Sequence, residues 1–257
     1  MRKEGDEQMM IQNRLFGVCV PLVLRKRSRA RGTKAMFWAL QRNPYPLMHV
    51  TQDDIDKLQL RPLWLWQLSP HSEVGVDDNT SEKEYVVSGF KLFEDYCKWL
   101  NKGTRYTLHK LSKSIEVSIE KPGRKAIESM YREQYPKIAN GVIDECFDLY
   151  MDMFTHEKAY AYVGRKDGEV AGMNMVVKDN QHDETHCLGV VLPQNRISGL
   201  GIYLNLMAIK DAIDENRKYN LGYGKYEYKE RLCNEKRAPK RLILADKDFM
   251  KRAGTPI

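Results

Sequence analysis

The second half of the chain has a pattern of apolar positions that predicts a helix followed by a short run of strands. From 140 to 156, apolar residues line one side of an amphipathic helix. Two apolar segments follow, 159–164 and 170–178. The turn Lys166-Asp167-Gly168 between them is typical of a β-hairpin, because an Asp-Gly pair supplies positive φ angles. Residues 185–192 predict another strand, and the mostly apolar stretch a few residues further on predicts a buried helix.

The first half has a less regular pattern. The segment 84–102 carries apolar residues at three- and four-residue steps, which predicts an amphipathic helix that Gly103 ends. The turn-forming sequence Lys121-Pro122-Gly123 indicates the junction between two halves of the chain, 1–123 and 124–257. The other expected elements are a buried strand at 14–24 followed by a basic turn, strands at 35–40, 62–68 and 106–120, a short helix capped by Thr51, and a loop at 73–83.

The overall composition allows one large domain or two modest ones and suits anionic partners. Of the 257 residues, 42% are hydrophobic, which is enough for a core. The net charge of +7 fits CoA phosphates, tRNA, acyl carrier protein or lipid headgroups equally well. The 5 cysteines are scattered without a Cys-x-x-Cys pair, which indicates neither a disulfide framework nor a zinc ribbon. We therefore expect a protein of the reducing cytoplasm.

The longest apolar run, 15–24, is too short to cross a membrane. It has about half of the ~20 residues that a spanning helix needs, and it contains Pro21. Acidic residues precede this run and a basic segment, 25–31, follows it, which is the wrong polarity for a signal peptide. We expect neither a membrane span nor export.

A glycine-containing loop between the strand predicted at 185–192 and the helix after it is the strongest chemical signal. Residues Arg196, Gly199 and Gly201 form an Arg-x-x-Gly-x-Gly sequence. Glycines let the backbone turn its N–H groups toward phosphate oxygens, and the following helix adds the positive end of its dipole. An arginine adds charge-assisted hydrogen bonds. A further spaced glycine is missing, which argues against a Rossmann NAD site and favours coenzyme A.

Together with Val191 and Pro193, this loop resembles the acyl-CoA loop of the GNAT acyltransferase superfamily. Downstream, Asn220-Leu221-Gly222 and the Tyr-Lys segment 228–232 are similar to the Fem-type branch, and the resemblance covers about 145–244. It implies an α/β fold with a mixed, mostly antiparallel sheet flanked by helices, in which 1–123 is a degenerate GNAT-like half and 124–257 a complete one. The implied acyl-CoA contacts are Val191, Leu192, Arg196, Ile197, Ser198, Gly199, Leu200 and Gly201.

The implied activity is transfer of an acyl group from acyl-CoA, a co-substrate, directly to an amine of a small metabolite, amino acid or peptide. In an extended strand Glu184 and His186 share a face, where either side chain can accept a proton from the acceptor ammonium, although an exposed polar hairpin end explains them as well. Cys187 points to the opposite face, as a core thiol. The His182-to-His186 segment lacks the spacing of a zinc helix, so no metal is expected.

The resemblance also implies roles for residues after the next strand. In the superfamily a tyrosine in this region often protonates the CoA thiolate, which makes Tyr226 and Tyr228 candidates, and Lys229 matches a lysine that offsets negative charge at the transfer site. Ordinary surface packing of tyrosines and a solvated helix lysine are the alternatives.

Two other functions fit the same residues. A Fem-type peptidyltransferase would use aminoacyl-tRNA as donor, and a non-catalytic protein on a GNAT scaffold would use the positive charge to bind nucleic acid. The intact loop favours CoA.

Overall fold

The computed structural model divides the chain into two compact units. One unit combines 1–83 with 238–257, and the other is the continuous segment 84–237. The residues whose structure is described are 8–15, 18–28, 36–40, 50–58, 63–77, 79, 82–134, 151, 154, 157–193 and 197–244. Within them, no helix combines the length and apolar character needed to cross a bilayer.

The first unit contains a sheet of six described strands. Its order is β1 (Gln8–Leu15), β2 (Val18–Ser28), β3 (Met36–Leu40), β4 (Leu63–Leu68), β13 (Lys240–Leu244) and β5 (Val76–Asp77). The strand predicted at 14–24 is in fact part of the β1–β2 hairpin, with Leu15 opposite Val18. Helix α1 (Gln52–Leu58) begins after Thr51 as predicted, because Thr51 and Asp54 cap it reciprocally: Asp54 N–H donates to Thr51 Oγ1 and Thr51 N–H to Asp54 Oδ2.

The second unit contains a sheet of seven described strands that is antiparallel except for one pair. Its order is β12 (Glu235–Arg237), β6 (Glu84–Val87), β11 (Lys218–Tyr223), β10 (Glu184–Val191), β9 (Glu169–Asp179), β8 (Ala159–Lys166) and β7 (Glu116–Glu120). Strands β10 and β11 are the parallel pair. The predicted turn between β8 and β9 has both residues at positive φ, 53° at Asp167 and 85° at Gly168.

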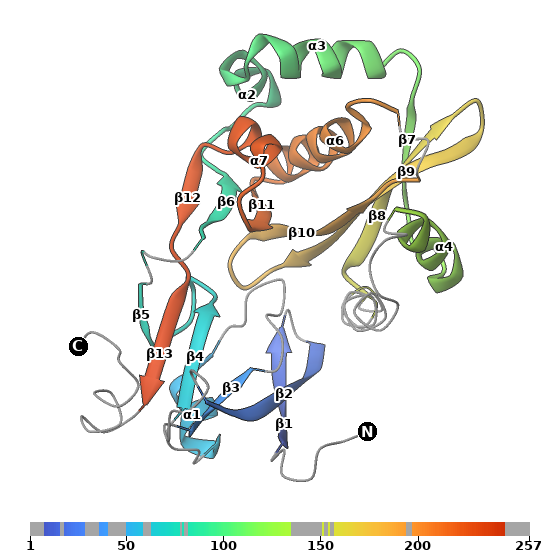
Figure 1. The fold of residues 1–257 in the computed structure, drawn as a ribbon. Helices are drawn as coiled ribbons and strands as arrows, with labels where there is room; N and C mark the ends of the chain where they lie inside the picture. Colours follow the sequence, from blue (N-terminus) through green and yellow to red (C-terminus); the bar gives the residue numbers. More distant parts are fainter. Residues whose placement is uncertain are drawn as a thin grey trace. The chain divides into compact units, whose positions relative to one another are not determined.

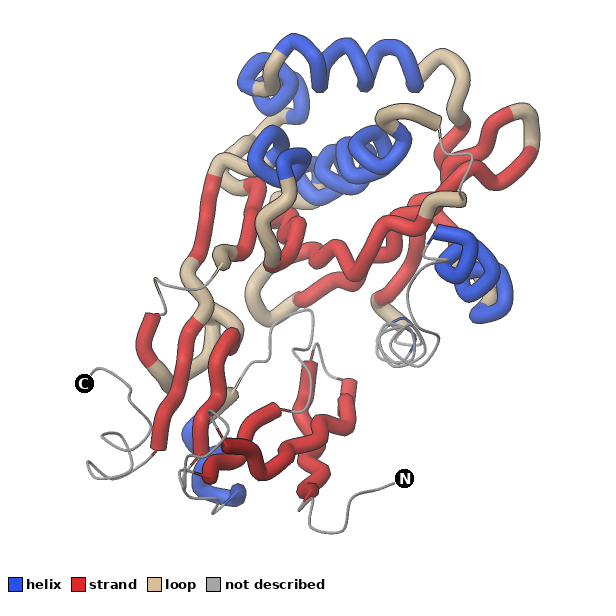
Figure 2. Tube along the Cα trace, viewed as in Figure 1, coloured by secondary structure: helices blue, strands red, loops and turns tan. Residues whose placement is uncertain are grey.

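Helix α6 (Leu200–Asp214) connects β10 to β11 and is the centre of the core in the second unit. Helices α2 (Phe93–Trp99) and α3 (Lys102–Leu111) pack against it (Figures 1 and 2), and α7 (Glu227–Leu232) packs against β6. Leu200, Leu204 and Leu206 of α6 are fully buried. Helix α4 (Arg124–Gln134) packs against β10, where the Gln134 side chain accepts a hydrogen bond from Leu192 N–H.

Several predictions differ from the structure. The segment predicted as a strand at 106–120 belongs to helix α3 as far as Leu111, because Asn101 caps that helix, and only Glu116–Glu120 is a strand. The loop predicted at 73–83 contains the short strand β5. The segment 84–102 is strand β6 followed by α2, because Gly89 lies at a φ of 76° between them and 84–87 pairs with β11 and β12. Gly103 lies in the first turn of α3 instead of ending a helix. The junction predicted at 123 falls inside the second unit, because β7 on one side of it pairs with β8 on the other. The helix predicted at 140–156 lies almost entirely outside the described residues.

Candidate functional site

The loop between β10 and α6 turns sharply at Gly199. This residue has a φ of 84°, in the left-handed region that favours glycine, and it is the N-cap of α6. Leu200 N–H donates to Ile197 O at 3.1 Å, and Tyr203 N–H donates to Gly199 O at 2.9 Å, which starts the helix. Arg196, which the sequence placed in this loop, lies outside the described residues.

The space around Gly199 also requires glycine. A Cβ atom there would lie 2.8 Å from Thr107 Cγ2 and 3.8 Å from Leu111 Cδ1, both on α3. Gly201 differs, because it lies inside α6 and a Cβ there would make ordinary contacts of 3.5 Å with Leu192 and Val190. One side of the bend is therefore closed by α3, and only Gly199 is needed for its conformation.

The first turn of α6 has the electrostatics of an anion site. It contains no acidic residue, and the Gly201 and Ile202 N–H groups make no hydrogen bond to another described residue. The positive end of the helix dipole lies at the same place. Among the predicted CoA-binding residues, Ser198 is exposed and Leu192 and Ile197 are half-buried, whereas the side chains of Val191 and Leu200 belong to the core. The latter two can contribute only their backbone.

The parallel strands β10 and β11 separate soon after they meet. Only Glu184 to His186 pair with Lys218 to Asn220, although β10 continues to Val191 and β11 to Tyr223. Register shifts between Cys187 and Gly189 and between Asn220 and Gly222 accompany the separation. Irregular strand pairing of this kind redirects side chains and frees backbone groups.

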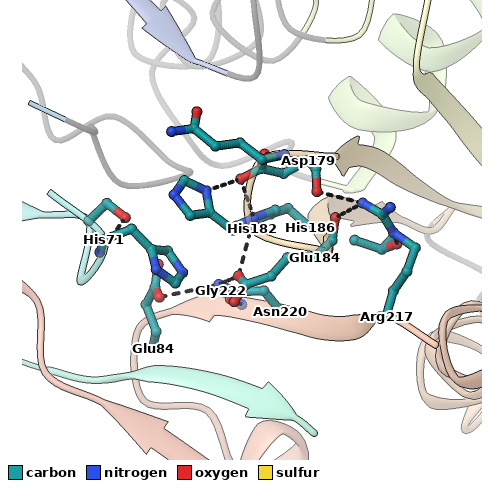
Figure 3. Close-up of polar contacts among 12 residues, drawn as sticks. His71, Glu84, Asp179, His182, Glu184, His186, Arg217, Asn220 and Gly222 are labelled. Atoms are coloured by element: carbon teal, nitrogen blue, oxygen red, sulfur yellow. Dashed lines mark hydrogen bonds and ion pairs between the residues drawn. The ribbon is translucent and has the colours of Figure 1, made fainter.

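A buried polar cluster lies at the last paired residues of β10 and β11 (Figure 3). Asn220 Nδ2 donates to Glu84 Oε2 at 3.2 Å and to Glu184 Oε2 at 3.3 Å, so one amide holds two carboxyl groups. The other oxygen of Glu184 forms an ion pair with Arg237. His186 Nε2 lies 3.4 Å from Glu184 Oε2 and 3.8 Å from Asp179 Oδ2. The prediction of an exposed hairpin end is therefore wrong for Glu184 and His186, which are 0% and 5% exposed.

The environment shifts the pKa values of two carboxyl groups in opposite directions. Burial raises the pKa of Glu84; the His186 ring opposes this shift and the Glu184 carboxylate adds to it. Burial also disfavours ionisation of Asp179, but its contacts with His186 and His182 outweigh that effect and hold its pKa below the ordinary value. The cluster thus combines a carboxyl group that tends to keep its proton with one that loses it readily.

The turn that precedes β10 is fixed by Arg217. Its Nη2 donates to the carbonyl oxygens of Asp179 and Glu184, both at 2.6 Å, and its Nη1 donates to Asn180. His182 Nδ1 lies 2.7 Å from Asp179 Oδ2 (Figure 3). Within the described residues, no group of three His, Cys, Asp or Glu side chains has the geometry to hold a metal ion.

The other predicted catalytic residues lie at the start of α7. Tyr226 is 60% exposed and Tyr228 is half-buried, with their rings 6.0 Å apart. Lys229 is 5% exposed and donates from Nζ to Tyr223 O at 2.7 Å, while its ammonium lies 5.2 Å from the Tyr226 ring and 6.0 Å from the Tyr85 ring. Lys229 is thus a buried cation and not a solvated helix residue.

The predicted catalytic residues fall on opposite faces of the sheet. Cys187 packs in the core beneath α6, as expected. Burial raises the pKa of its thiol to about 11, and the positive charge of Lys229 opposes this shift. Glu184 and His186 precede Cys187 at alternating positions and face the other way. The structure therefore brings Glu184 close to His186 on the side of the sheet opposite Cys187.

Several residues of this region had no role at the site predicted from the sequence. Glu84, Asn220 and Arg237 complete the buried cluster, and Thr107 closes one side of the loop. A weak signal existed, since Glu84 and Asn220 are polar residues within otherwise apolar strand sequences, EYVV and KYNLGY. Nothing local connects Arg237 or Thr107 to the site.

Comparison with known proteins identifies the fold. No protein-family model matches the chain, and no curated protein matches its sequence. FemX matches it with a TM-score of 0.56 at 6% identity, over 95% of this chain and 89% of that chain. The C-terminal domain of an Agrobacterium fabrum protein assigned as a lysylphosphatidylglycerol synthetase matches with a TM-score of 0.54 at 10% identity, over 94% and 85%.

A GCN5-related N-acetyltransferase from Kribbella flavida matches with a TM-score of 0.42 at 11% identity, over 93% of this chain and 89% of that chain. In the second unit, hairpin, strand, glycine loop and helix follow one another in the order predicted from the sequence, and the strand after that helix pairs in parallel with β10. The matches to FemX and to the synthetase domain, together with this order of elements, show a GNAT-like fold, a mixed α/β architecture with a mostly antiparallel sheet flanked by helices.

Proposed function

We propose that the chain transfers an acyl group from a coenzyme A thioester directly to an amine. The observation that carries this proposal is the bend at Gly199, which directs the acid-free N-terminus of α6 to the end of β10, next to the region where β10 and β11 separate. Backbone N–H groups and a helix dipole at one point are suited to a diphosphate. The donor would bind there, with its thioester extended toward the strand separation.

The proposed chemistry assigns the two sheet faces to the two substrates. The amine nitrogen attacks the thioester carbonyl, and its proton passes to His186, whose Nε2 lies 3.4 Å from Glu184 Oε2. A carbon–nitrogen bond forms and the carbon–sulfur bond breaks. On the α6 side, the Lys229 ammonium offsets negative charge on the leaving thiolate, which takes a proton from Tyr226, Tyr228 or water. Glu184 is a poor base itself, because Arg237 pairs with it.

The test uses one added negative charge at either end of α6. Ser198→Asp places a carboxylate at the proposed phosphate site on an exposed residue, and the helix itself tolerates an acidic residue there. Asn216→Asp adds the same charge beyond the C-terminal end of α6, at an exposed position with a φ of 56° that aspartate also adopts. Calorimetry with CoA and thiol release from a panel of acyl-CoAs and amines are then measured for both variants.

We expect wild-type protein and Asn216→Asp to bind CoA and release thiol, and Ser198→Asp to lose at least about tenfold in CoA affinity while remaining folded. Such a loss corresponds to about 1.4 kcal/mol, within the range for one charge next to a phosphate. Wild-type protein that neither binds CoA nor releases thiol would remove this function. Equal behaviour of the two variants would remove the loop as the donor site.

A second donor, aminoacyl-tRNA, is favoured by the outward surface of α3. The chain has no acidic residue between Lys102 and Ile115. One face of this segment carries a basic or aromatic side chain at nearly every helical turn, and Tyr106 on it is 65% exposed. Such a surface suits a phosphate backbone with an unstacked base. Its exposed residues are Lys102, Arg105, Tyr106, His109, Lys110 and Lys113.

This candidate predicts a different response to salt. Binding of RNA should weaken steeply between about 50 and 200 mM salt, and Lys110→Glu should reduce that dependence. Aminoacyl transfer that requires intact RNA, without thiol release from acyl-CoA, would favour the tRNA donor. RNA binding without any transfer would instead favour a non-catalytic nucleic-acid-binding protein.

A further inference from the structure

A second buried polar network runs through the core of the second unit beneath α6. Asn174 of β9 donates from Nδ2 to the Tyr219 hydroxyl on β11 at 2.9 Å, and this hydroxyl donates to Asn205 Oδ1 on α6 at 3.0 Å. Asn205 Nδ2 then donates to Gly201 O at 2.8 Å. At the other end, Cys187 Sγ donates to Asn174 Oδ1 at 3.3 Å. The network therefore begins at the strand separation and ends in the first turn of α6.

The position of this network is unusual for polar side chains. Asn174, Asn205 and Tyr219 are 0%, 1% and 1% exposed, and the residues around them form the apolar core. Apolar side chains of similar volume would fill the same space without a need for hydrogen bonds. Because buried polar groups are stabilising only when all their bonds are made, such a network fixes one arrangement of the elements that it connects.

The connection has a specific direction. Asn205 bonds to the carbonyl oxygen of Gly201, two residues after Gly199, and so constrains the turn that presents the N–H groups of α6. Tyr219 lies opposite Thr185 in the short parallel pairing of β10 and β11. The same side chains thus join the helix terminus to the strands on both sides of β10.

We propose that Tyr219 and Asn205 are positioning residues that hold the first turn of α6 in the conformation required to bind the donor's phosphates. This inference rests on the proposed function for its ligand, the phosphate groups of CoA. A preorganised turn binds without a further ordering cost. Loss of the network should therefore weaken donor binding more than it lowers the rate of acyl transfer in the bound complex.

The experiment compares two tyrosine hydroxyls in the same core. Tyr219→Phe removes the central hydroxyl, while Asn174 Nδ2 keeps Asn205 Oδ1 as an acceptor at 3.4 Å, so the fold is retained. The matched control is Tyr162→Phe, because Tyr162 is 1% exposed and donates to Asp211, near the opposite end of α6, at 3.0 Å. Hydrogen exchange of the Gly201 to Tyr203 amides, CoA calorimetry and KM and kcat for acyl-CoA are measured.

We expect Tyr219→Phe to accelerate exchange in the first turn of α6 and to raise the CoA Kd and the acyl-CoA KM about five- to tenfold, with kcat changed less than about twofold. Tyr162→Phe should leave all of these near wild type. Asn205→Ser is a second variant, because serine can still bond to Gly201 O but no longer reaches Tyr219, and it should weaken binding similarly.

The possible outcomes separate the two proposals. Equal effects of Tyr219→Phe and Tyr162→Phe, or no effect of Tyr219→Phe on exchange and binding, would overturn the positioning role. Selective loosening of the first turn by Tyr219→Phe in a protein whose wild type does not bind CoA would support the structural connection and reject the proposed function.

Discussion

Replacement of Gly199 by alanine tests how the glycine loop is built. Two costs are expected. A left-handed φ of 84° disfavours any residue with a Cβ by about 1–2 kcal/mol. The new Cβ would also lie 2.8 Å from Thr107 Cγ2, and overpacking of this kind costs about 1–3 kcal/mol. Gly199→Ala should therefore lower the free energy of unfolding by about 2–5 kcal/mol, measured by urea denaturation.

Gly168 provides the control for the backbone part of this cost. Its φ is 85°, nearly the same as at Gly199, but nothing lies within 4 Å of the position of a Cβ. Gly168→Ala should therefore cost only the backbone part, about 1–2 kcal/mol of unfolding free energy. In the Gly199→Ala background, Thr107→Ser removes Cγ2 but keeps the hydroxyl that donates to Gly103 O. It should therefore recover the part of the cost that comes from the close contact with Cγ2. Equal losses at the two glycines, or no recovery with Thr107→Ser, would refute the proposed packing.

Three further predictions concern buried groups. Arg237→Met should destabilise the protein by about 3–5 kcal/mol in urea titrations, because it leaves the Glu184 carboxylate buried without its cation. Adding Glu184→Gln should recover much of this loss. A loss below about 1 kcal/mol for Arg237→Met would contradict the ion pair. Because the pKa of Glu84 is raised, its contribution to stability is complete below the ordinary value of 4.5 and is lost as pH rises through the folded-state pKa. The Glu84→Gln variant should therefore gain stability relative to wild type as the pH rises. Parallel curves of unfolding free energy against pH for the two proteins would disprove this. Cys187 should react with a thiol reagent at about pH 8 only after unfolding, because it is 4% exposed and its pKa is about 11; rapid modification of the native protein at this residue, located by mass spectrometry, would disagree.

Local sequence signals predicted the parts of the fold whose causes are local. The β8–β9 hairpin follows from Asp167-Gly168, where both residues have positive φ. Helix α1 follows from the reciprocal bonds of Thr51 and Asp54. The strand, glycine loop and buried helix around Gly199 also lie where they were predicted. In each case the residues that determine the conformation are neighbours in sequence.

Pairings between distant segments explain what the sequence did not predict. The apolar spacing at 84–102 fits a helix, but 84–87 pairs with strands more than one hundred residues later, and the sheet overrides the helical pattern. Glu184 was expected near solvent because its neighbours are polar, yet its cation, Arg237, is 53 residues away. The amide that holds Glu84 is 136 residues away, in Asn220.

The first unit is assembled from both ends of the chain, which has a consequence for how the protein is made. Strand β13 pairs with β4 and β5, so the six-stranded sheet lacks one of its inner strands until residue 240 has been synthesised. The second unit is continuous and is complete by residue 237. During synthesis on the ribosome the second unit can therefore fold before the first one. The sheet of the first unit keeps unpaired strand edges until β13 has been synthesised.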